Sequence, residues 1–214
     1  MSDSASHLGY AASRYNSHLA FLCHALRSQA RIGAIAPTSP RVARQIAALI
    51  PTRPGRIVVE LGAGTGAIST AIGPRLGHGS RHIAVEREAA LLGALTHEAP
   101  WAERVHADAQ DLTARLEDVG VSAADVVVSS LPWANFDTGL QQGILNQVIQ
   151  LLVPGGLFVA IAYRPTRMTH GSRAFRSAVR SSFDQVRVSS TLWTNLPPAR
   201  LYVCHSPTAR RLMP

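Results

Sequence analysis

One segment of the chain concentrates glycines at a spacing that suits ligand binding: Glu60-Leu61-Gly62-Ala63-Gly64-Thr65-Gly66, where a short, mostly apolar stretch ends. Glycines in such a loop let the backbone turn tightly and approach a ligand closely. Gly62, Gly64 and Ala67 fit the pattern G-x-G-x-x-A, and Glu86 lies about 20 residues beyond, where an acid that binds ribose hydroxyls belongs. The spacing therefore predicts a site for a nucleoside-containing cofactor. A purely structural turn is the alternative.

Three further features favour S-adenosylmethionine over a nicotinamide dinucleotide. The carboxylate of Glu60 can bind the amino-acid end of S-adenosylmethionine, directly or through water, and a nicotinamide dinucleotide has no such ammonium group. Asp108 follows the third predicted strand, where it can accept a hydrogen bond from an adenine amino group. The residues Val153-Pro154-Gly155-Gly156 predict a tight helix-to-strand turn before the fifth strand.

The elements that must position these residues alternate between strand and helix from Arg56 onward. Apolar runs predict strands at 57–61, 82–85, 104–107, 125–129 and 156–163. Helices are predicted between them at 66–76, 88–97, 111–119 and 138–152. A basic helix at 172–182 and strands at 185–192 and 200–205 follow. The pattern predicts a doubly wound parallel α/β sheet closed by an antiparallel pair.

The N-terminal region predicts two helices. Residues 15–31 carry apolar side chains at helical spacing, with Arg27 and Arg31 largely off that stripe. This helix can either lie in a bilayer interface or cover the cofactor pocket. Ser39 can cap a second helix that has Pro40 in its first turn and ends at Pro51.

Composition excludes several classes of protein. The chain is 46% hydrophobic and 16% charged, which is typical of a globular domain and not of intrinsic disorder. No apolar run reaches the ~20 residues of a membrane-spanning helix, and the start lacks the basic residues of a secretory signal, so a cytoplasmic location is expected. Cys23 and Cys204 are expected to be buried free thiols, and the nine His residues show no metal-ligand spacing.

The charge is unevenly distributed. All 21 basic residues are Arg, and the formal balance is +6 over residues 1–56, −6 over 57–163 and +8 over 164–214. Basic ends around an acidic middle suggest that the ends face something anionic, such as a membrane surface. A solvated basic surface is the alternative, and a GC-rich genome also explains the absence of Lys.

Together, these features resemble the class I S-adenosylmethionine-dependent methyltransferases across residues 56–205. The resemblance implies a Rossmann-like, seven-stranded sheet with a reversed last strand. It also implies contacts to each part of the cofactor. The methionine part is surrounded by Glu60, Gly62, Ala63, Gly64 and Gly66. The ribose hydroxyls are bound by Glu86, and the adenine is contacted by Asp108 with Ala109. Ser130 is expected among the cofactor contacts.

The segment after the fourth predicted strand is expected to shape the site of the methyl acceptor. Its residues Leu131, Pro132 and Trp133 suit an amine, because carbonyl groups around Leu131 can hold an N–H and the face of Trp133 can stabilise charge growing on nitrogen. Methyl transfer is a direct displacement, so positioning supplies most of the catalysis. A rigid turn with Trp133 in the core is the alternative.

Three stretches resemble bacterial phospholipid N-methyltransferases, which methylate phosphatidylethanolamine. They are residues 31–40, Ser130-Leu131-Pro132 with Asn135-Phe136, and Asn195-Leu196-Pro197-Pro198-Ala199-Arg200. The resemblance implies an amine-bearing phospholipid acceptor and a peripheral position on the inner membrane face. It predicts a lid or membrane-contact segment at 1–55, the methyltransferase domain at 56–205 and a tail at 206–214.

Other acceptors are kept as alternatives. Trp133-Ala134 departs from the aliphatic residues expected in many phospholipid N-methyltransferases, which keeps a small-molecule or peptide amine open. Leu131-Pro132-Trp133 is similar to the Pro-aromatic loop of adenine-N6 methyltransferases, so an RNA adenine is a further candidate. A non-enzymatic membrane- or RNA-binding module is least favoured, because every expected cofactor position is filled. No metal is expected.

Overall fold

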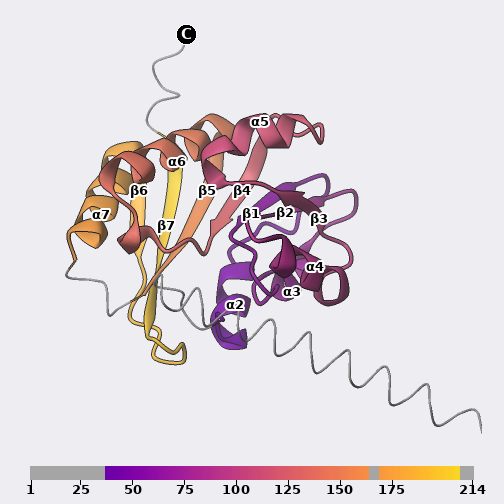
Figure 1. Cartoon of the computed structure of the whole chain (residues 1–214), viewed down its shortest axis with the longest axis horizontal. Coiled ribbons are helices and arrows are strands. Elements are labelled where there is room, and N and C mark those ends of the chain that lie inside the picture. Colours follow the sequence, from indigo (N-terminus) through magenta and orange to yellow (C-terminus); the bar gives the residue numbers. More distant parts are fainter. Residues whose placement is uncertain (1–36, 164–168, 208–214) are drawn as a thin grey trace, which may run out of the picture. The chain divides into compact units, whose positions relative to one another are not determined.

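The computed structural model describes residues 37–163 and 169–207, which form a seven-stranded sheet with helices on both faces (Figure 1). The strand order is β3-β2-β1-β4-β5-β7-β6. The strands are β1 Ile57–Leu61, β2 Arg81–Glu86, β3 Glu103–His106, β4 Ala124–Ser129, β5 Leu152–Tyr163, β6 Phe183–Val188 and β7 Ala199–Pro207. Strands β1 to β5 pair in parallel, whereas β7 runs antiparallel to β5 and β6. The predicted Rossmann-like sheet with a reversed last strand is confirmed.

Helices flank the sheet in two groups (Figure 1). One face carries α5 Leu112–Glu117, α6 Thr138–Leu151 and α7 His170–Ser182, and the other carries α2 Pro40–Ala47, α3 Ser69–Ile72 and α4 Ala89–Glu98. Short 3₁₀ turns lie at Gly73–Arg75 (η1), Ala109–Asp111 (η2) and Trp133–Asn135 (η3). As predicted, Ser39 caps α2, with its side chain accepting a hydrogen bond from the Val42 amide, and Pro40 begins the helix.

Two predicted elements were wrong in extent. The helix predicted at 66–76 is reduced to α3 and η1, because positive φ angles continue through Gly66 and Pro74 lacks the amide that an α-helix needs. The strand predicted at 185–192 ends at Val188, and Leu192 makes only an isolated bridge to Ala199.

The predicted turn at 153–156 is an irregularity inside β5 rather than a turn before it. Ala124 and Val126 of β4 pair with Leu152 and Leu157 of β5, so the extra residues of β5 bulge out of the ladder. Gly155 takes a positive φ of 76° within this bulge.

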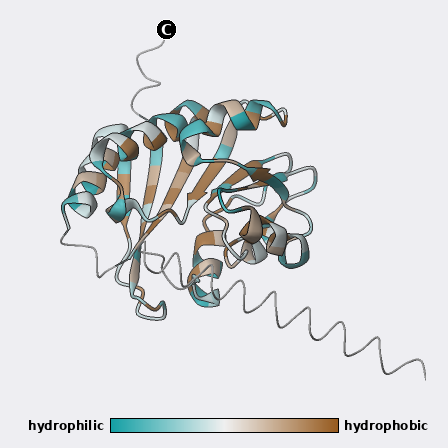
Figure 2. Ribbon diagram, viewed as in Figure 1, coloured by the Kyte–Doolittle hydropathy of each residue, from teal (hydrophilic) through white to brown (hydrophobic). Residues whose placement is uncertain are grey.

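The central strands are apolar because both of their faces are covered, as Figure 2 shows. Val58, Val59, Val126, Val127 and Phe158 are fully buried. Cys204 is buried as predicted, and burial raises the pKa of its thiol to about 12, so the thiol stays protonated at neutral pH. None of the helices in the described ranges is both long and apolar enough to span a bilayer. Cys23 and the helix predicted at 15–31 lie outside the described residues.

Candidate active site

The glycine loop lies at the carboxyl end of β1, between the crossovers to β2 on one side and β4 on the other. Such a switch point is where open α/β sheets bind ligands. The amide of Gly62 donates to the Val85 carbonyl at 2.9 Å, and the amide of Ser130 donates to the Leu61 carbonyl at 3.0 Å. These bonds tie the loop to both neighbouring strands.

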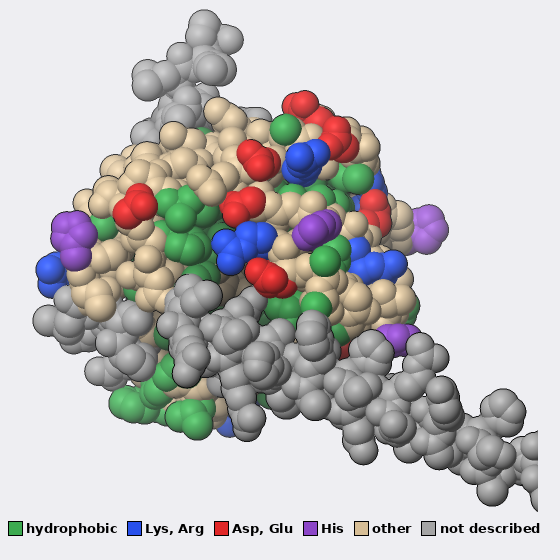
Figure 3. Space-filling model, viewed as in Figure 1, with side chains coloured by type: hydrophobic (Ala, Val, Ile, Leu, Met, Phe, Trp, Pro, Cys, Tyr) green, Lys and Arg blue, Asp and Glu red, His purple; other side chains and the backbone are tan. Residues whose placement is uncertain are grey.

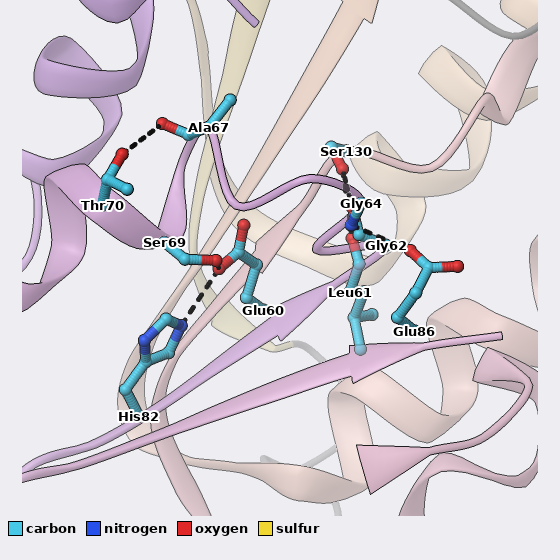
Figure 4. A network of polar contacts seen from close by, with 10 residues as sticks. All are labelled: Glu60, Leu61, Gly62, Gly64, Ala67, Ser69, Thr70, His82, Glu86 and Ser130. Carbon is cyan, nitrogen blue, oxygen red and sulfur yellow. Dashed lines mark hydrogen bonds and ion pairs between the residues drawn. The ribbon is translucent and has the colours of Figure 1, made fainter. Parts of the chain in front are cut away.

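Glu60 is the first buried polar side chain of the site. It is fully buried, and its Oε2 accepts hydrogen bonds from Ser69 Oγ at 2.7 Å and from His82 Nε2 at 3.0 Å (Figure 4). Its other oxygen, Oε1, is buried and has no hydrogen-bond partner among the described residues. A buried carboxylate oxygen without a donor is costly unless a ligand satisfies it. The residues therefore fit the ammonium end of S-adenosylmethionine.

His82 and Ser69 were not predicted to take part in the site. Both are buried, and they approach the same oxygen of Glu60 from β2 and α3 (Figure 4). A carboxylate only accepts hydrogen bonds, so His82 Nε2 is the donor. The signal for His82 was present in the sequence: a His in an apolar strand, at a position whose side chain faces the same side of the sheet as Glu60.

Glu86 is nearly buried at the end of β2 and holds the backbone of the site. Its Oε2 accepts from the Gly64 amide at 2.9 Å, and its Oε1 accepts from the Glu88 amide at 2.9 Å. Each carboxylate oxygen can accept more than one hydrogen bond, so capacity remains for ribose hydroxyls. Glu86 thus shapes the glycine loop, and its spare acceptor capacity is compatible with the predicted contact to ribose hydroxyls.

Replacing Glu86 by alanine is expected to weaken the binding of S-adenosylmethionine by roughly 1.5–3 kcal/mol, the usual loss for hydrogen bonds to a charged group. The amide of Gly64 also loses its acceptor, which loosens the loop before the ligand arrives. Titration calorimetry measures the effect. An unchanged dissociation constant would place the ribose elsewhere.

Asp108 and Ala109 follow β3 at the same edge of the sheet. Asp108 Oδ1 accepts from the Gln110 amide at 3.0 Å and caps η2, while Oδ2 lies 3.9 Å from an Arg87 nitrogen. Ala109 is buried, and the Ala107 amide donates to the Glu86 carbonyl at 3.2 Å. The segment expected to contact adenine is therefore joined to the segment expected to contact the ribose.

The loop after β4 contacts the glycine loop directly. Ser130 Oγ donates to the Gly62 carbonyl (Figure 4), and a β-carbon at Gly62 would lie only 3.1 Å from Leu131 Cδ2. Pro132, with φ −79° and ψ 63°, is the centre of an inverse γ-turn in which the Trp133 amide donates to the Leu131 carbonyl at 2.8 Å. Two segments about 70 residues apart in the chain thus form one surface.

Trp133 anchors this loop in the core. It is 2% exposed, its indole nitrogen donates to Ser129 Oγ at 3.0 Å, and its ring stacks on Phe175 with centroids 4.6 Å apart. Gln141 Nε2 donates to the Trp133 carbonyl at 2.6 Å. This packing favours the core role over an open aromatic face for the acceptor.

Metal binding finds no support in the part of the chain that is described, which holds no cluster of three or more His, Cys, Asp or Glu side chains able to bind an ion.

No protein-family model matches the chain. The ornithine lipid N-methyltransferase of Singulisphaera acidiphila is 36% identical over 176 residues, which cover 81% of this chain and 88% of that protein. Among solved structures, the O-methyltransferase from Bacillus cereus in complex with SAH has a TM-score of 0.67 at 14% identity, covering 86% of this chain and 90% of that one. TrmN from Thermus thermophilus has a TM-score of 0.59 at 21% identity, and the match covers 78% of this chain and 48% of TrmN, so it spans about half of that protein's length. At these identities the two structures show the shared fold alone.

Proposed function

Because the chain belongs to the class I S-adenosylmethionine-dependent methyltransferases, in the family of the ornithine lipid N-methyltransferase, we propose that it methylates the amine of a membrane-lipid headgroup. Phosphatidylethanolamine is the first acceptor proposed, from the three sequence stretches given above. The observation that carries the proposal is the contact of Ser130 and Leu131 with Gly62, because it joins the acceptor loop to the cofactor loop.

The proposed cofactor contacts follow from the polar groups at the edge of the sheet. Oε1 of Glu60 accepts from the ammonium group, Glu86 from the ribose hydroxyls and Asp108 from the adenine amino group. The other proposed contacts come from the backbone of the glycine loop and from two further residues: Gly62, Ala63, Gly64 and Gly66, with Ser130 and Ala109. When bound, S-adenosylmethionine supplies an electrophilic methyl group on a sulfonium sulfur.

The proposed roles of the acceptor loop are positional. The Leu131 carbonyl already accepts the Trp133 amide, and its second lone pair can accept an N–H of the neutral acceptor amine. Holding that N–H leaves the nitrogen lone pair free to point toward the methyl group. Pro132 fixes the turn, and Trp133 holds it from inside the core. In this proposal the N–C bond would form as the S–C bond of the sulfonium breaks, which leaves a neutral thioether. The methylated amine then loses its surplus proton to water, so the transfer needs no general base from the chain.

Ornithine lipid is the second acceptor proposed, because the relative that is 36% identical over 176 residues carries that lipid in its name. Both lipids present an amine on a bilayer surface. The small-amine alternative was based on the departure at Trp133-Ala134, and the RNA-adenine alternative on the Leu131-Pro132-Trp133 loop and the positive charge. The 2% exposure of Trp133 gives neither alternative an open aromatic face, and both remain arms of the acceptor test.

The chain is also proposed to bind peripherally at the cytoplasmic face of the membrane. Arg27 and Arg31, which lie outside the described residues, are candidate contacts with the lipid headgroups.

Incubation of the purified chain with methyl-labelled S-adenosylmethionine tests the acceptor. Separate reactions contain phosphatidylethanolamine vesicles, ornithine lipid vesicles, a structured RNA and a panel of soluble amines. Label in the lipid extract of one vesicle reaction is expected, and the Glu60→Gln chain serves as the inactive control. Label only in RNA or in a soluble amine would overturn the lipid proposal.

A further inference from the structure

The β6–β7 loop (residues 189–198) exposes two large apolar side chains. Trp193 is 70% exposed and Leu196 is 80% exposed, whereas the other exposed large hydrophobic residues in the described ranges reach at most 43%. We call Trp193 and Leu196 the apolar tip. Large apolar side chains exposed close together in one loop commonly mark a contact surface for a membrane or a protein.

The loop around the apolar tip is held in place. Its base is closed by the bridge between Leu192 and Ala199. Between the two tip residues, Asn195 is 1% exposed, and its Oδ1 accepts from the Ser39 amide at 2.8 Å. Its Nδ2 donates to the Pro197 carbonyl at 2.8 Å. These hydrogen bonds hold the backbone of the loop at Asn195, while the side chains of Trp193 and Leu196 on either side of it are exposed.

The apolar tip projects from the edge of the sheet that also carries the glycine loop. Ala199, which follows the loop, pairs with Tyr163 at the carboxyl end of β5. The carboxyl ends of parallel strands share one edge, so the loop lies at the edge of the candidate active site. Figure 3 shows hydrophobic side chains projecting at the end of the molecule where Figure 1 places this loop.

The charge of the neighbouring segments favours an anionic partner. Arg41 and Arg44 are exposed on α2, whose amino end is bonded to Asn195, and Arg187 is exposed on β6. Residues 37–56 contain no acid, and residues 169–207 contain only Asp184, at the far end of β6. Arginines around an apolar group match the layering of an anionic bilayer, where acyl chains lie beneath charged headgroups.

We propose that the apolar tip docks this chain on a lipid bilayer, with Trp193 and Leu196 entering the interface and the nearby arginines contacting anionic headgroups. The ring of Trp suits this position because it is apolar with one polar N–H. The inference deepens the proposed function, on which it rests for the identity of the surface that holds the acceptor. It places membrane contact on the sheet domain itself, in addition to the predicted helix at 15–31.

Tryptophan fluorescence tests this docking directly. In a Trp101→Phe chain the remaining indoles are Trp193 and Trp133, and the second is buried. Vesicles of phosphatidylglycerol and phosphatidylethanolamine with brominated acyl chains are expected to quench and blue-shift Trp193. The chain with both Trp101→Phe and Trp193→Phe should show neither effect. Co-sedimentation with the vesicles without quenching of Trp193 would overturn the proposal.

Substitution supplies a second measurement. Trp193→Ser/Leu196→Ser is expected to weaken vesicle binding by about tenfold or more, since membrane affinity scales with the apolar area inserted. The matched control is Trp101→Ser/Val119→Ser, which also removes two exposed apolar side chains. Both residues precede parallel strands, β3 and β4, and so lie at the opposite edge of the sheet from the loop, and this variant should bind like the original chain. Equal losses in both double variants, or no loss in the tip variant, would contradict docking through the tip.

The readouts separate this inference from the proposed function. If the chain methylates lipids, the tip variant should lose activity on vesicles and keep it on short-chain lipid dispersed as monomers. If no lipid amine is methylated while brominated lipid still quenches Trp193, the proposed function fails and the docking surface stands. Binding of the tip to another protein rather than to lipid would leave vesicles without effect on Trp193.

Discussion

Replacing Glu60 by glutamine is expected to weaken the binding of S-adenosylmethionine by about 100-fold or more without lowering stability. In this variant the ammonium group of S-adenosylmethionine would leave water and contact the neutral amide of the glutamine. Removing one partner of a buried ion pair typically costs about 3–5 kcal/mol. In the free protein, however, Glu60 Oε1 is buried without a donor among the described residues, so a neutral side chain relieves a desolvation cost. The midpoint of thermal unfolding should stay the same or rise.

Titration calorimetry and thermal unfolding on the same samples check both parts of this expectation. Glu103→Gln is the matched control, because Glu103 is an exposed glutamate that pairs with Arg81 at 2.6 Å at the start of β3. That ion pair holds the pKa of the Glu103 carboxyl below its usual range, but an exposed pair contributes little to stability. Normal affinity in Glu60→Gln would remove Glu60 from the cofactor site.

Replacing Gly64 by valine is expected to abolish measurable binding of S-adenosylmethionine while the sheet stays folded. Gly64 has φ +56°, and the nearest atom to an added β-carbon is the Gly62 carbonyl oxygen at 3.9 Å. The substituent would therefore enter open space, which we expect the bound cofactor to occupy. The left-handed conformation costs a residue with a β-carbon about 1–2 kcal/mol, so a modest loss of stability should accompany the loss of binding.

Gly79→Val separates the backbone strain from the steric block. Gly79 has φ +70° with nothing within 4 Å of an added β-carbon, and it lies in the turn before β2, away from the glycine loop. Both variants should lose similar stability, measured by chemical denaturation, and only Gly64→Val should lose binding. Equal affinity in the two variants would show that the ligand does not approach Gly64.

Sequence patterns determined most of the local structure. Apolar runs identified β1, β2, β4 and β5 to within a few residues, apart from the earlier start of β5, because burial of both faces leaves little room for polar side chains. The edge strand β3, which is largely exposed, was placed by the strand–helix alternation instead. Ser39 with Pro40 fixed the start of α2, since capping is a matter of adjacent residues. The glycine loop was equally local, because left-handed φ angles at Gly62, Gly64 and Gly66 depend on the absence of a β-carbon.

Contacts between distant segments were decided by the tertiary structure. His82 reaches Glu60 because the register of β1 with β2 places them on one face of the sheet, and register depends on the packing of whole strands. The sequence did not distinguish a core position for Trp133 from a position in the acceptor pocket. The tertiary structure places Trp133 in the core, because α7 stacks Phe175 on its ring.

The β6–β7 loop shows the same division between local and distant information. Its sequence predicts a connection rich in turn residues, which is a local property. Exposure of Trp193 and Leu196 depends instead on Asn195, whose hydrogen bond to Ser39 spans 156 residues. A single sequence carries no direct signal for a bond that spans so many residues, because the bond requires the start of α2 to pack against the β6–β7 loop.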